Sequence, residues 1–354
     1  MKRKNLIVKK KINKEKSLIK NIKVKKFYIR FKKIILKNIR KDNFAVAVSG
    51  GSDSLCLAYF SKMLSNEIDN KIDILIVDHK LRKESSKEAI KVKNILKKNN
   101  IKSNILSWKG TIPIKNIQNG ARNIRYSLIA NYCMKKKIRF LLTAHHMDDQ
   151  IENFFIRLFR GSGLTGLSSM SETFDYSTNF KIIRPFLNFK KSDLGFITLQ
   201  YFKTFIKDPS NENDKYLRVR VRKYRDNLEK EGLDTKKIIN TVNNLFSANK
   251  ALNYYKSKSL NKHVNFFSKN KCLISKNIFL EEAGEIIFKS FSEILSLISG
   301  SYYPPRSKKI TSLIKRTKKS NFRKSTLGGC IIEKKDRFIL ISKEPIFKKR
   351  SINL

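Results

Sequence analysis

The stretch Phe44-Ala45-Val46-Ala47-Val48-Ser49-Gly50-Gly51-Ser52-Asp53-Ser54 decides the fold. Its apolar half is typical of a buried strand because glycines follow it, and the run from Leu55 to Leu64 has the apolar spacing of a helix. The motif Ser49–Ser54 is therefore predicted to lie on a strand-to-helix turn. Backbone N–H groups and the positive end of a helix dipole converge at such a turn, which favours an anion such as a nucleotide phosphate.

The residue types in this loop suit a phosphate. Gly50 and Gly51 let the backbone approach closely, the hydroxyls of Ser49, Ser52 and Ser54 are donors, and Asp53 can hold a Mg²⁺ that neutralises phosphate charge. The lysine of the Gly-x-x-x-x-Gly-Lys-Ser/Thr motif is absent, so ordinary P-loop NTPase chemistry is disfavoured. The alternative interpretation is a serine- and glycine-rich turn without a ligand.

Composition narrows the class of protein. At 354 residues the chain is long enough for about two domains. Its 78 Lys and Arg residues against 29 acidic ones give a formal net charge of +49, which favours a polyanionic partner, above all nucleic acid. Part of this excess can reflect coding bias, because Lys, Ile and Asn dominate throughout.

The sequence also indicates a compartment. No run approaches the ~18 apolar residues that span a bilayer, and the N-terminus lacks an apolar core followed by a cleavage site. We expect a soluble, cytoplasmic protein with no membrane partner; the choice between a bacterial cytoplasm and an organelle stays open. Its four cysteines are far apart and form no C-x-x-C pair, so we expect them to be reduced and structural: Cys56, Cys133, Cys272 and Cys330.

Strands and helices alternate after Phe44. Predicted strands are 44–48, 72–77, 104–108 and 139–144; predicted helices are 84–98, 117–136 and 147–160, with a loop at 161–166 and an extended segment at 182–186. This alternation predicts an α/β fold with a doubly wound, mostly parallel sheet. Ligands of such sheets bind beyond the carboxyl ends of the strands. Ser49–Ser54, Asp78-His79 and His145-His146 all follow strands, so they predict one cleft.

The stretch from His145 to Glu152 places two imidazoles and three carboxylates at a strand end and the helix after it. Asp148 and Asp149 could simply be favourable charges at a helix N-terminus. A zinc site is a weak rival because the H-E-x-x-H pattern is absent. A nucleotide and Mg²⁺ cleft accounts better for both residue types.

Several arginines could supply bidentate donors to phosphate: Arg122, Arg125, Arg157, Arg160, Arg218, Arg220 and Arg222. The ladder Arg218-Val219-Arg220-Val221-Arg222 cannot place all three arginines on one helix face, so it predicts a mixed role in packing and binding.

These motifs together resemble the tRNA(Ile)-lysidine synthetase family of the PP-loop (N-type) ATP pyrophosphatase superfamily. Ser49–Ser54 fits the superfamily's SGGxDS loop. The segments that resemble this particular family are Val77–Arg82, Asn116–Arg122 with Arg125-Tyr126, Ala144–Glu152, Arg157–Gly166 and Asp208–Asn211. Tyr303-Pro304-Pro305-Arg306 and Thr326–Cys330 match the family's following domain more loosely.

The resemblance implies a two-step modification of the wobble cytidine in an isoleucine tRNA with a CAU anticodon. ATP adenylates the 2-carbonyl oxygen of the base, and the ε-amine of free L-lysine then displaces AMP to give lysidine. The implied cofactors are ATP and Mg²⁺. The implied catalytic residues are Asp53, Arg122, Asp149 and Arg220, with Asp53 and Asp149 near the metal. The implied nucleotide-binding residues are Ser49, Gly50, Gly51, Ser52, Asp53, Ser54, Asp78, His79, His145 and His146.

The expected domains are a basic N-terminal extension (1–41), a PP-loop catalytic domain (42–214), a helical bridge (215–265) and a small α+β domain that binds tRNA or substrate (266–354). Within the extension, one helix face is predicted from Tyr28, Phe31, Ile34, Ile35 and Ile39. The residues before Lys23 are a solvated tail, an RNA-touching arm or a transit peptide. The oligomeric state stays open, a homodimer included.

The chain departs from the family pattern at a few positions. Asn153 stands where Thr is frequent, and Lys207 where an acidic residue is common. It ends soon after the Leu327 motif, so we expect the additional C-terminal domain of longer relatives to be missing and tRNA selection to rest on the remaining basic surface. The rival functions are a tRNA 2-thiolase, which the lack of a C-x-x-C pair disfavours, a small-molecule amidating enzyme, and an inactive RNA-binding protein of the same fold.

Overall fold

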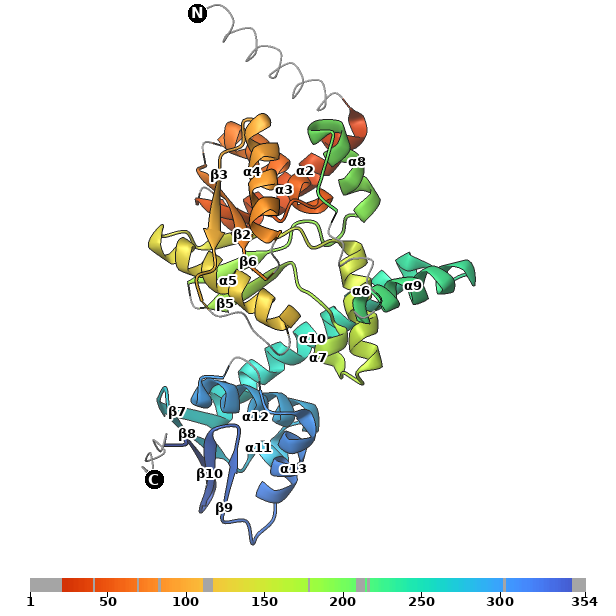
Figure 1. Cartoon of the computed structure of the whole chain (residues 1–354). Helices are drawn as coiled ribbons and strands as arrows, with labels where there is room; N and C mark the ends of the chain where they lie inside the picture. The colour runs from red at the N-terminus through yellow and green to blue at the C-terminus, as the bar shows by residue number, and fades with distance from the viewer. Residues whose placement is uncertain are drawn as a thin grey trace, which may run out of the picture. The chain divides into compact units, whose positions relative to one another are not determined.

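The computed structural model describes residues 21–40, 42–68, 70–81, 84–110, 117–177, 179–207, 214, 217–301 and 304–345, without the side chains of 117–119. The described residues up to Asn243 form one compact unit and those from Asn244 onward form a second (Figure 1). The boundary falls inside the helical bridge that the sequence predicts. The basic tail up to residue 20, the turn at 208–211 and residue 303 lie outside the described residues.

A six-stranded sheet with the order β3-β2-β1-β4-β6-β5 organises the first unit. Its strands are β1 (Phe44–Ala47), β2 (Ile72–Asp78), β3 (Ser103–Ser107), β4 (Phe140–Leu142), β5 (Thr173–Ser177) and β6 (Phe180–Ile183). Every neighbouring pair is parallel except β5 and β6, which are antiparallel. The predicted doubly wound, mostly parallel sheet is confirmed.

Helices cover both faces of this sheet (Figure 1). They are α2 (Ile22–Ile39), α3 (Ser52–Ile68), α4 (Ser85–Lys98) and α8 (Lys191–Phe202) on one face and α5 (Ile117–Lys135) on the other. The remaining helices up to residue 263 are α6 (Met147–Phe159), α7 (Leu164–Leu167), α9 (Leu217–Lys230) and α10 (Thr235–His263). Side chains alternate along a strand, so Val46 packs toward α2, α3, α4 and α8, whereas Ala45 packs toward α5. The loop expected at 161–166 runs into the short helix α7.

Helix α2 confirms the apolar face predicted from its sequence. Asn21 caps its first turn, accepting hydrogen bonds from the N–H groups of Lys23 and Val24. Tyr28, Phe31, Ile35 and Ile39 are buried, and Ile34 packs beside them. Residues 22–39 thus form part of the core of the first unit.

The strand order reverses beside β1, which pairs with β2 on one side and β4 on the other. A parallel sheet has its ligand crevice at such a switch point, outside the carboxyl ends of the strands. The loop after β1 carries Ser49–Ser54, and the one after β4 carries His145 and His146. The topology therefore brings the two motifs to one edge of the sheet.

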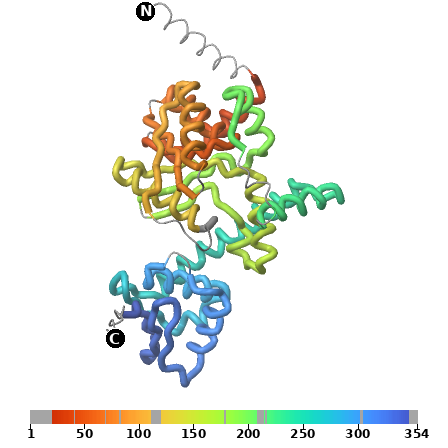
Figure 2. The backbone as a smooth tube through the Cα atoms, viewed as in Figure 1, coloured from red at the N-terminus to blue at the C-terminus, as the bar shows by residue number. Residues whose placement is uncertain are grey.

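The second unit contains a five-stranded antiparallel sheet with the order β7-β8-β11-β10-β9. Its strands are β7 (Val264–Ser268), β8 (Lys271–Ser275), β9 (Lys324–Leu327), β10 (Cys330–Lys335) and β11 (Phe338–Lys343). One face packs against α11 (Ile278–Glu281), α12 (Gly284–Ser299) and α13 (Ser307–Thr317), where Phe291 and Leu313 are fully buried. The expected smaller α+β fold is confirmed, and Figure 2 shows one continuous stretch of chain, coloured cyan to blue, forming the sheet and these helices.

Among the helices in the described ranges, none combines the length and apolar character that a bilayer crossing needs.

Candidate active site

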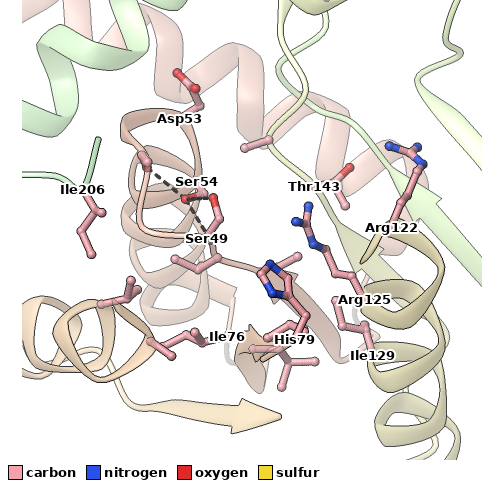
Figure 3. Close-up of a pocket in the computed structure, with 18 of the residues that line it drawn as sticks. Ser49, Asp53, Ser54, Ile76, His79, Arg122, Arg125, Ile129, Thr143 and Ile206 are labelled. Atoms are coloured by element: carbon pink, nitrogen blue, oxygen red, sulfur yellow. Dashed lines mark hydrogen bonds between the residues drawn. The ribbon is translucent and has the colours of Figure 1, made fainter. Parts of the chain in front are cut away.

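A pocket of about 400 Å³ lies at the carboxyl ends of the parallel strands (Figure 3). The sequence-predicted residues that line it are Ser49, Gly51, Asp53, Ser54, His79, Arg122, His145 and Asp149. Those that do not line it are Gly50, Ser52, Asp78, His146 and Arg220. Apolar side chains such as Ile76 and Ile129 form part of the wall, while Arg122 and Arg125 project from α5 (Figure 3). The pocket thus combines an apolar wall with anion-binding groups, as a nucleotide requires.

Ser54 holds the loop after β1 in shape. Its Oγ accepts hydrogen bonds from the backbone N–H groups of Ser49 and Gly50, each at 3.2 Å, and donates to the carbonyl of Gly51 at 3.0 Å (Figure 3). The N–H groups that open α3 lack acceptors within the helix, as at every helix N-terminus. The N–H groups at the start of α3 are therefore donors available to a phosphate, and the role of this loop as a phosphate cradle stays a prediction.

Gly50 is required by both its backbone and its neighbours. Its φ is +92°, and a Cβ there would lie 2.5 Å from Cγ2 of Val92 and 3.3 Å from Cδ1 of Ile206. The N–H of Ile206 also donates to the Gly50 carbonyl at 2.9 Å. Sequence reasoning missed these two contacts, because neither neighbour belongs to a recognisable motif.

The carboxylate of Asp78 accepts hydrogen bonds from residues that follow it in the chain. Its carboxylate accepts from the hydroxyls of Ser85 and Ser86, both at 2.6 Å, and from the N–H of Lys80 at 3.1 Å. Burial alone would raise the pKa of Asp78, but these hydrogen bonds outweigh it and lower the pKa. Asp78 thus fixes the β2–α4 connection, from which the neighbouring His79 reaches the pocket.

His146 links the two carboxylates predicted to hold Mg²⁺. Its Nε2 lies 3.6 Å from Oδ2 of Asp53 and 3.5 Å from Oδ2 of Asp149. The N–H of His146 donates to Asp149, whose own N–H returns a bond to Nδ1, so the pair caps α6. Burial would lower the pKa of His146, but the nearby charges of Asp53, Asp149 and Asp148 raise it.

These carboxylates fit a magnesium ion shared with phosphates. Among the residues the structure describes, no group of three or more His, Cys, Asp or Glu side chains is arranged to hold a metal. Mg²⁺ bound with a nucleotide usually takes only one or two protein carboxylates and completes its shell with phosphate and water. Asp53 and Asp149 meet this requirement, since both line the pocket.

His145 has the opposite electrostatic environment. Its Nδ1 lies 3.0 Å from Oγ1 of Thr143. Burial first, and then the positive charges of Arg184 and Arg122, lower the pKa of His145 well below its usual value. It therefore enters the pocket as a neutral imidazole that can donate or accept a hydrogen bond near neutral pH.

Ion pairs hold α9 against α6 at the pocket mouth. The Arg218 guanidinium bridges Asp149 and Glu152, and Arg222 binds the other oxygen of Glu152 at 2.8 Å. Glu152 is only 1% exposed, and burial would raise its pKa, but the two arginines lower it. Arg225 adds a bond to Asp148 at 2.8 Å.

The structure distinguishes the arginines of the predicted ladder. Arg218 lines the pocket, whereas Arg220 is not among the lining residues and donates to the carbonyl of Asp214 at 3.4 Å. Arg218 lies at the pocket and Arg222 pairs with Glu152, while a binding role for the ladder stays a prediction. The choice of Arg220 as the catalytic member stays a prediction.

Comparison with known proteins places this geometry in a family. Residues 23–225 match the family model described as a PP-loop domain. The chain is 35% identical to the tRNA(Ile)-lysidine synthase of Orientia tsutsugamushi (strain Boryong) over 311 residues, covering 85% of this chain and 69% of that protein. It is 35% identical to the enzyme of the same name from Wolbachia pipientis wMel over 306 residues, covering 85% and 70%.

Solved structures support the fold alone. The U34-tRNA thiolase NcsA from Methanococcus maripaludis superposes with a TM-score of 0.53 at 20% identity, covering 63% of this chain and 80% of that one. A pocket at the switch point, a loop that fits SGGxDS and the extent of these matches agree. The chain therefore contains a PP-loop domain and belongs to the tRNA(Ile)-lysidine synthase family.

Proposed function

We propose that this chain is an ATP-dependent ligase that converts the wobble cytidine of an isoleucine tRNA with a CAU anticodon into lysidine, so that the tRNA decodes AUA as isoleucine. The observation that carries the proposal is the position of His146 between Asp53 and Asp149, beside a pocket with a phosphate cradle. The names of the relatives over most of the chain support the same substrate.

In the first step, the 2-carbonyl oxygen of the cytidine bonds to the α-phosphorus of ATP, and pyrophosphate leaves. The loop Ser49–Ser54 would hold the phosphates, and Asp53 with Asp149 would hold Mg²⁺, which neutralises their charge when bound. Arg122 and Arg218 line the pocket where negative charge develops, so both are placed to stabilise it. Asp78 supports this step indirectly, by positioning the loop of His79.

In the second step, the amine of lysine bonds to C2 of the base, the C2–O bond breaks, and AMP leaves with its electron pair. The amine must be neutral to attack, so a proton has to pass to a base. We assign this role to a carboxylate that lines the pocket, where Asp53, Glu88 and Asp149 lie, and not to Glu152, because both of its oxygens bind arginines. The base reaches the pocket by leaving its stack, which an anticodon loop permits.

Thiolation is the second candidate, because a U34-tRNA thiolase shares the fold. The four cysteines argue against it: all are buried and free. Burial raises the pKa of Cys133 and Cys272 to about 12 and that of Cys330 to about 11, and it raises the pKa of Cys56 well above its usual value. Reactive thiolates need the reverse shift.

The deciding experiment incubates the protein with ATP, radiolabelled lysine and the isoleucine tRNA, and counts label in the RNA. We expect label together with AMP and pyrophosphate. Asp53→Ala is expected to stop pyrophosphate release while tRNA binding persists. Absence of label, AMP and pyrophosphate with the unaltered chain would refute the proposal.

A further inference from the structure

Helix α10 has an unusual composition for its length. Its 29 residues, TKKIINTVNNLFSANKALNYYKSKSLNKH, include six lysines and no acidic residue. The part from Asn244 onward belongs to the second unit. Exposed helices commonly mix charges of both signs, whereas the charged side chains of α10 are all positive.

Contacts with α11 and α12 fix which side of α10 faces inward. Lys289 of α12 donates to Oδ1 of Asn249 at 2.8 Å, Lys256 pairs with Glu293, and Leu260 packs against the core of the second unit. Ser259 and His263 are buried on the same side. The inward side is thus occupied by partners from the second unit itself.

The opposite side is exposed. At about 100° per residue, the positions furthest from the buried side carry Ser247, Lys250, Tyr254, Lys258 and Asn261, which we call the outer face of α10. Tyr254 is 58% exposed. Nζ of Lys258 lies 4.9 Å from the centroid of the Tyr254 ring, and the Tyr255 ring makes an edge contact with Tyr254 at 5.5 Å.

Lysines alone would make an ordinary solvated face in so basic a chain. Tyr254 is different, because its ring is exposed instead of packing in the core. It lies between Lys250 and Lys258, each one helical turn away. Basic groups around an exposed aromatic ring are the elements of a single-stranded nucleic-acid surface, where bases stack on the ring and cations bind the phosphates. An acidic protein partner would explain the lysines but not the need for a flat ring.

We propose that the outer face of α10 binds RNA, specifically a looped segment of the tRNA substrate other than the base that enters the pocket. Lys250 and Lys258 contact phosphates, and Tyr254 stacks on an unpaired base. Hydroxyl and amide groups of Ser247 and Asn261 add hydrogen bonds to the sugar-phosphate backbone. The identity of the RNA rests on the proposed function; the surface itself rests on its charge and exposure.

The first test measures tRNA binding by the full chain against salt concentration. Lys250→Ala/Lys258→Ala is compared with Lys93→Ala/Lys97→Ala, which removes the same charge from two exposed lysines four apart on α4. Two lost phosphate contacts should reduce the log–log salt slope by roughly 1.4–1.8. We expect this reduction for the α10 variant only.

The second test addresses stacking. Tyr254→Ala is expected to weaken tRNA binding by roughly 5- to 150-fold, while Tyr254→Phe, which keeps the ring, retains it within about 2-fold. Circular dichroism melting of each variant controls for folding. Because these residues are exposed, their melting temperatures should match that of the unaltered chain.

The outcomes separate the two proposals. Equal salt slopes for the α10 and α4 variants, with full binding by Tyr254→Ala, would overturn the RNA-binding face; an acidic protein partner would give this result. Failure of the unaltered chain to form lysidine would count against the proposed function alone, because the binding tests require no turnover.

Discussion

Arg218 illustrates how much one side chain controls at this site. It holds the pocket carboxylate Asp149 and the buried Glu152 together, so its removal leaves the Asp149 side chain with only its contacts to His146. Hydrogen bonds to charged groups contribute about 1.5–3 kcal/mol each. Arg218→Ala should therefore lower kcat/KM for lysidine formation by roughly 10- to 150-fold.

Arg222→Ala is the matched control, because it removes the other Glu152 partner and leaves Asp149 paired. Both variants should lose similar stability in urea titrations, whereas Arg218→Ala should lose more activity. Arg220→Ala, measured beside them, decides between the ladder arginines. A greater loss for Arg220→Ala than for Arg218→Ala would contradict the role given to Arg218.

Gly50 allows a second prediction at the residue scale. A Cβ would meet Val92 at 2.5 Å, and its φ of +92° disfavours side chains. Gly50→Ala should destabilise the protein by about 2–5 kcal/mol through strain and overpacking. Urea unfolding measures the loss.

Two further variants check the cause. In the double variant Gly50→Ala/Val92→Ala the smaller side chain at position 92 leaves room for the new Cβ. Gly50→Ala should therefore destabilise Val92→Ala less than it destabilises the unaltered chain. Gly195→Ala, in α8 where a Cβ meets nothing within 4 Å, should be neutral or stabilising. If Gly50→Ala resembled Gly195→Ala, the close packing of the loop would be wrong.

At the scale of elements, the β2–α4 connection depends on ionised Asp78. Its folded pKa is lowered, so the stability it contributes is present above the unfolded value of about 3.9 and is lost as pH falls through the folded pKa. Asp78→Ala should lower the free energy of unfolding by about 1–3 kcal/mol at pH 7.

The difference between Asp78→Ala and the unaltered chain should shrink below about pH 4, because the unfolded chain then binds a proton at Asp78 while the folded protein keeps this carboxylate ionised. Urea titrations at pH 7 and pH 3.5 measure it. A difference that stayed constant with pH would show that the hydrogen bonds do not depend on the carboxylate charge.

The elements that the sequence predicted well are those with strong apolar patterns. β1, the middle of β2 and the first half of α3 are buried, so nearly continuous apolar runs reveal them. β5 went unpredicted, because this half-exposed edge strand contains Asp175 and little apolar periodicity. The helical bridge expected over 215–265 divides into α9 and α10 where Gly232 adopts φ +94°.

The site likewise contains features that local sequence motifs predict and features that only the packing of helices determines. Local motifs predicted the cradle, His145 and Asp149 because strand topology places them at one edge. The pairing of Arg218 with Asp149 depends on how α9 packs on α6, and no local pattern encodes that packing. For the same reason the sequence could not show that Asp78 binds its own loop.

At the scale of the whole molecule, each unit has its own core. Phe291 is fully buried in the second unit, and Phe60 is fully buried in the first. Phe291→Ala should cost about 3–5 kcal/mol. Scanning calorimetry should show the transition of the second unit moving down by more than about 10 °C while that of the first stays.

Phe60→Ala should lower the transition temperature of the first unit and leave that of the second unit unchanged. Parallel shifts of all transitions in both variants would instead indicate that the units unfold as one cooperative body.

The contact of Gly50 with Val92 and Ile206 has a consequence for protein engineering. The six residues Ser49–Ser54 look like a motif that could be transplanted into another protein. Their conformation nevertheless depends on the space left by Val92 of α4 and on a hydrogen bond from the N–H of Ile206, more than 150 positions later. A chimera that transplants the motif onto another parallel sheet would need space at both positions and a donor at the second. Recombination breakpoints that separate residue 50 from residue 206 should therefore yield few working hybrids.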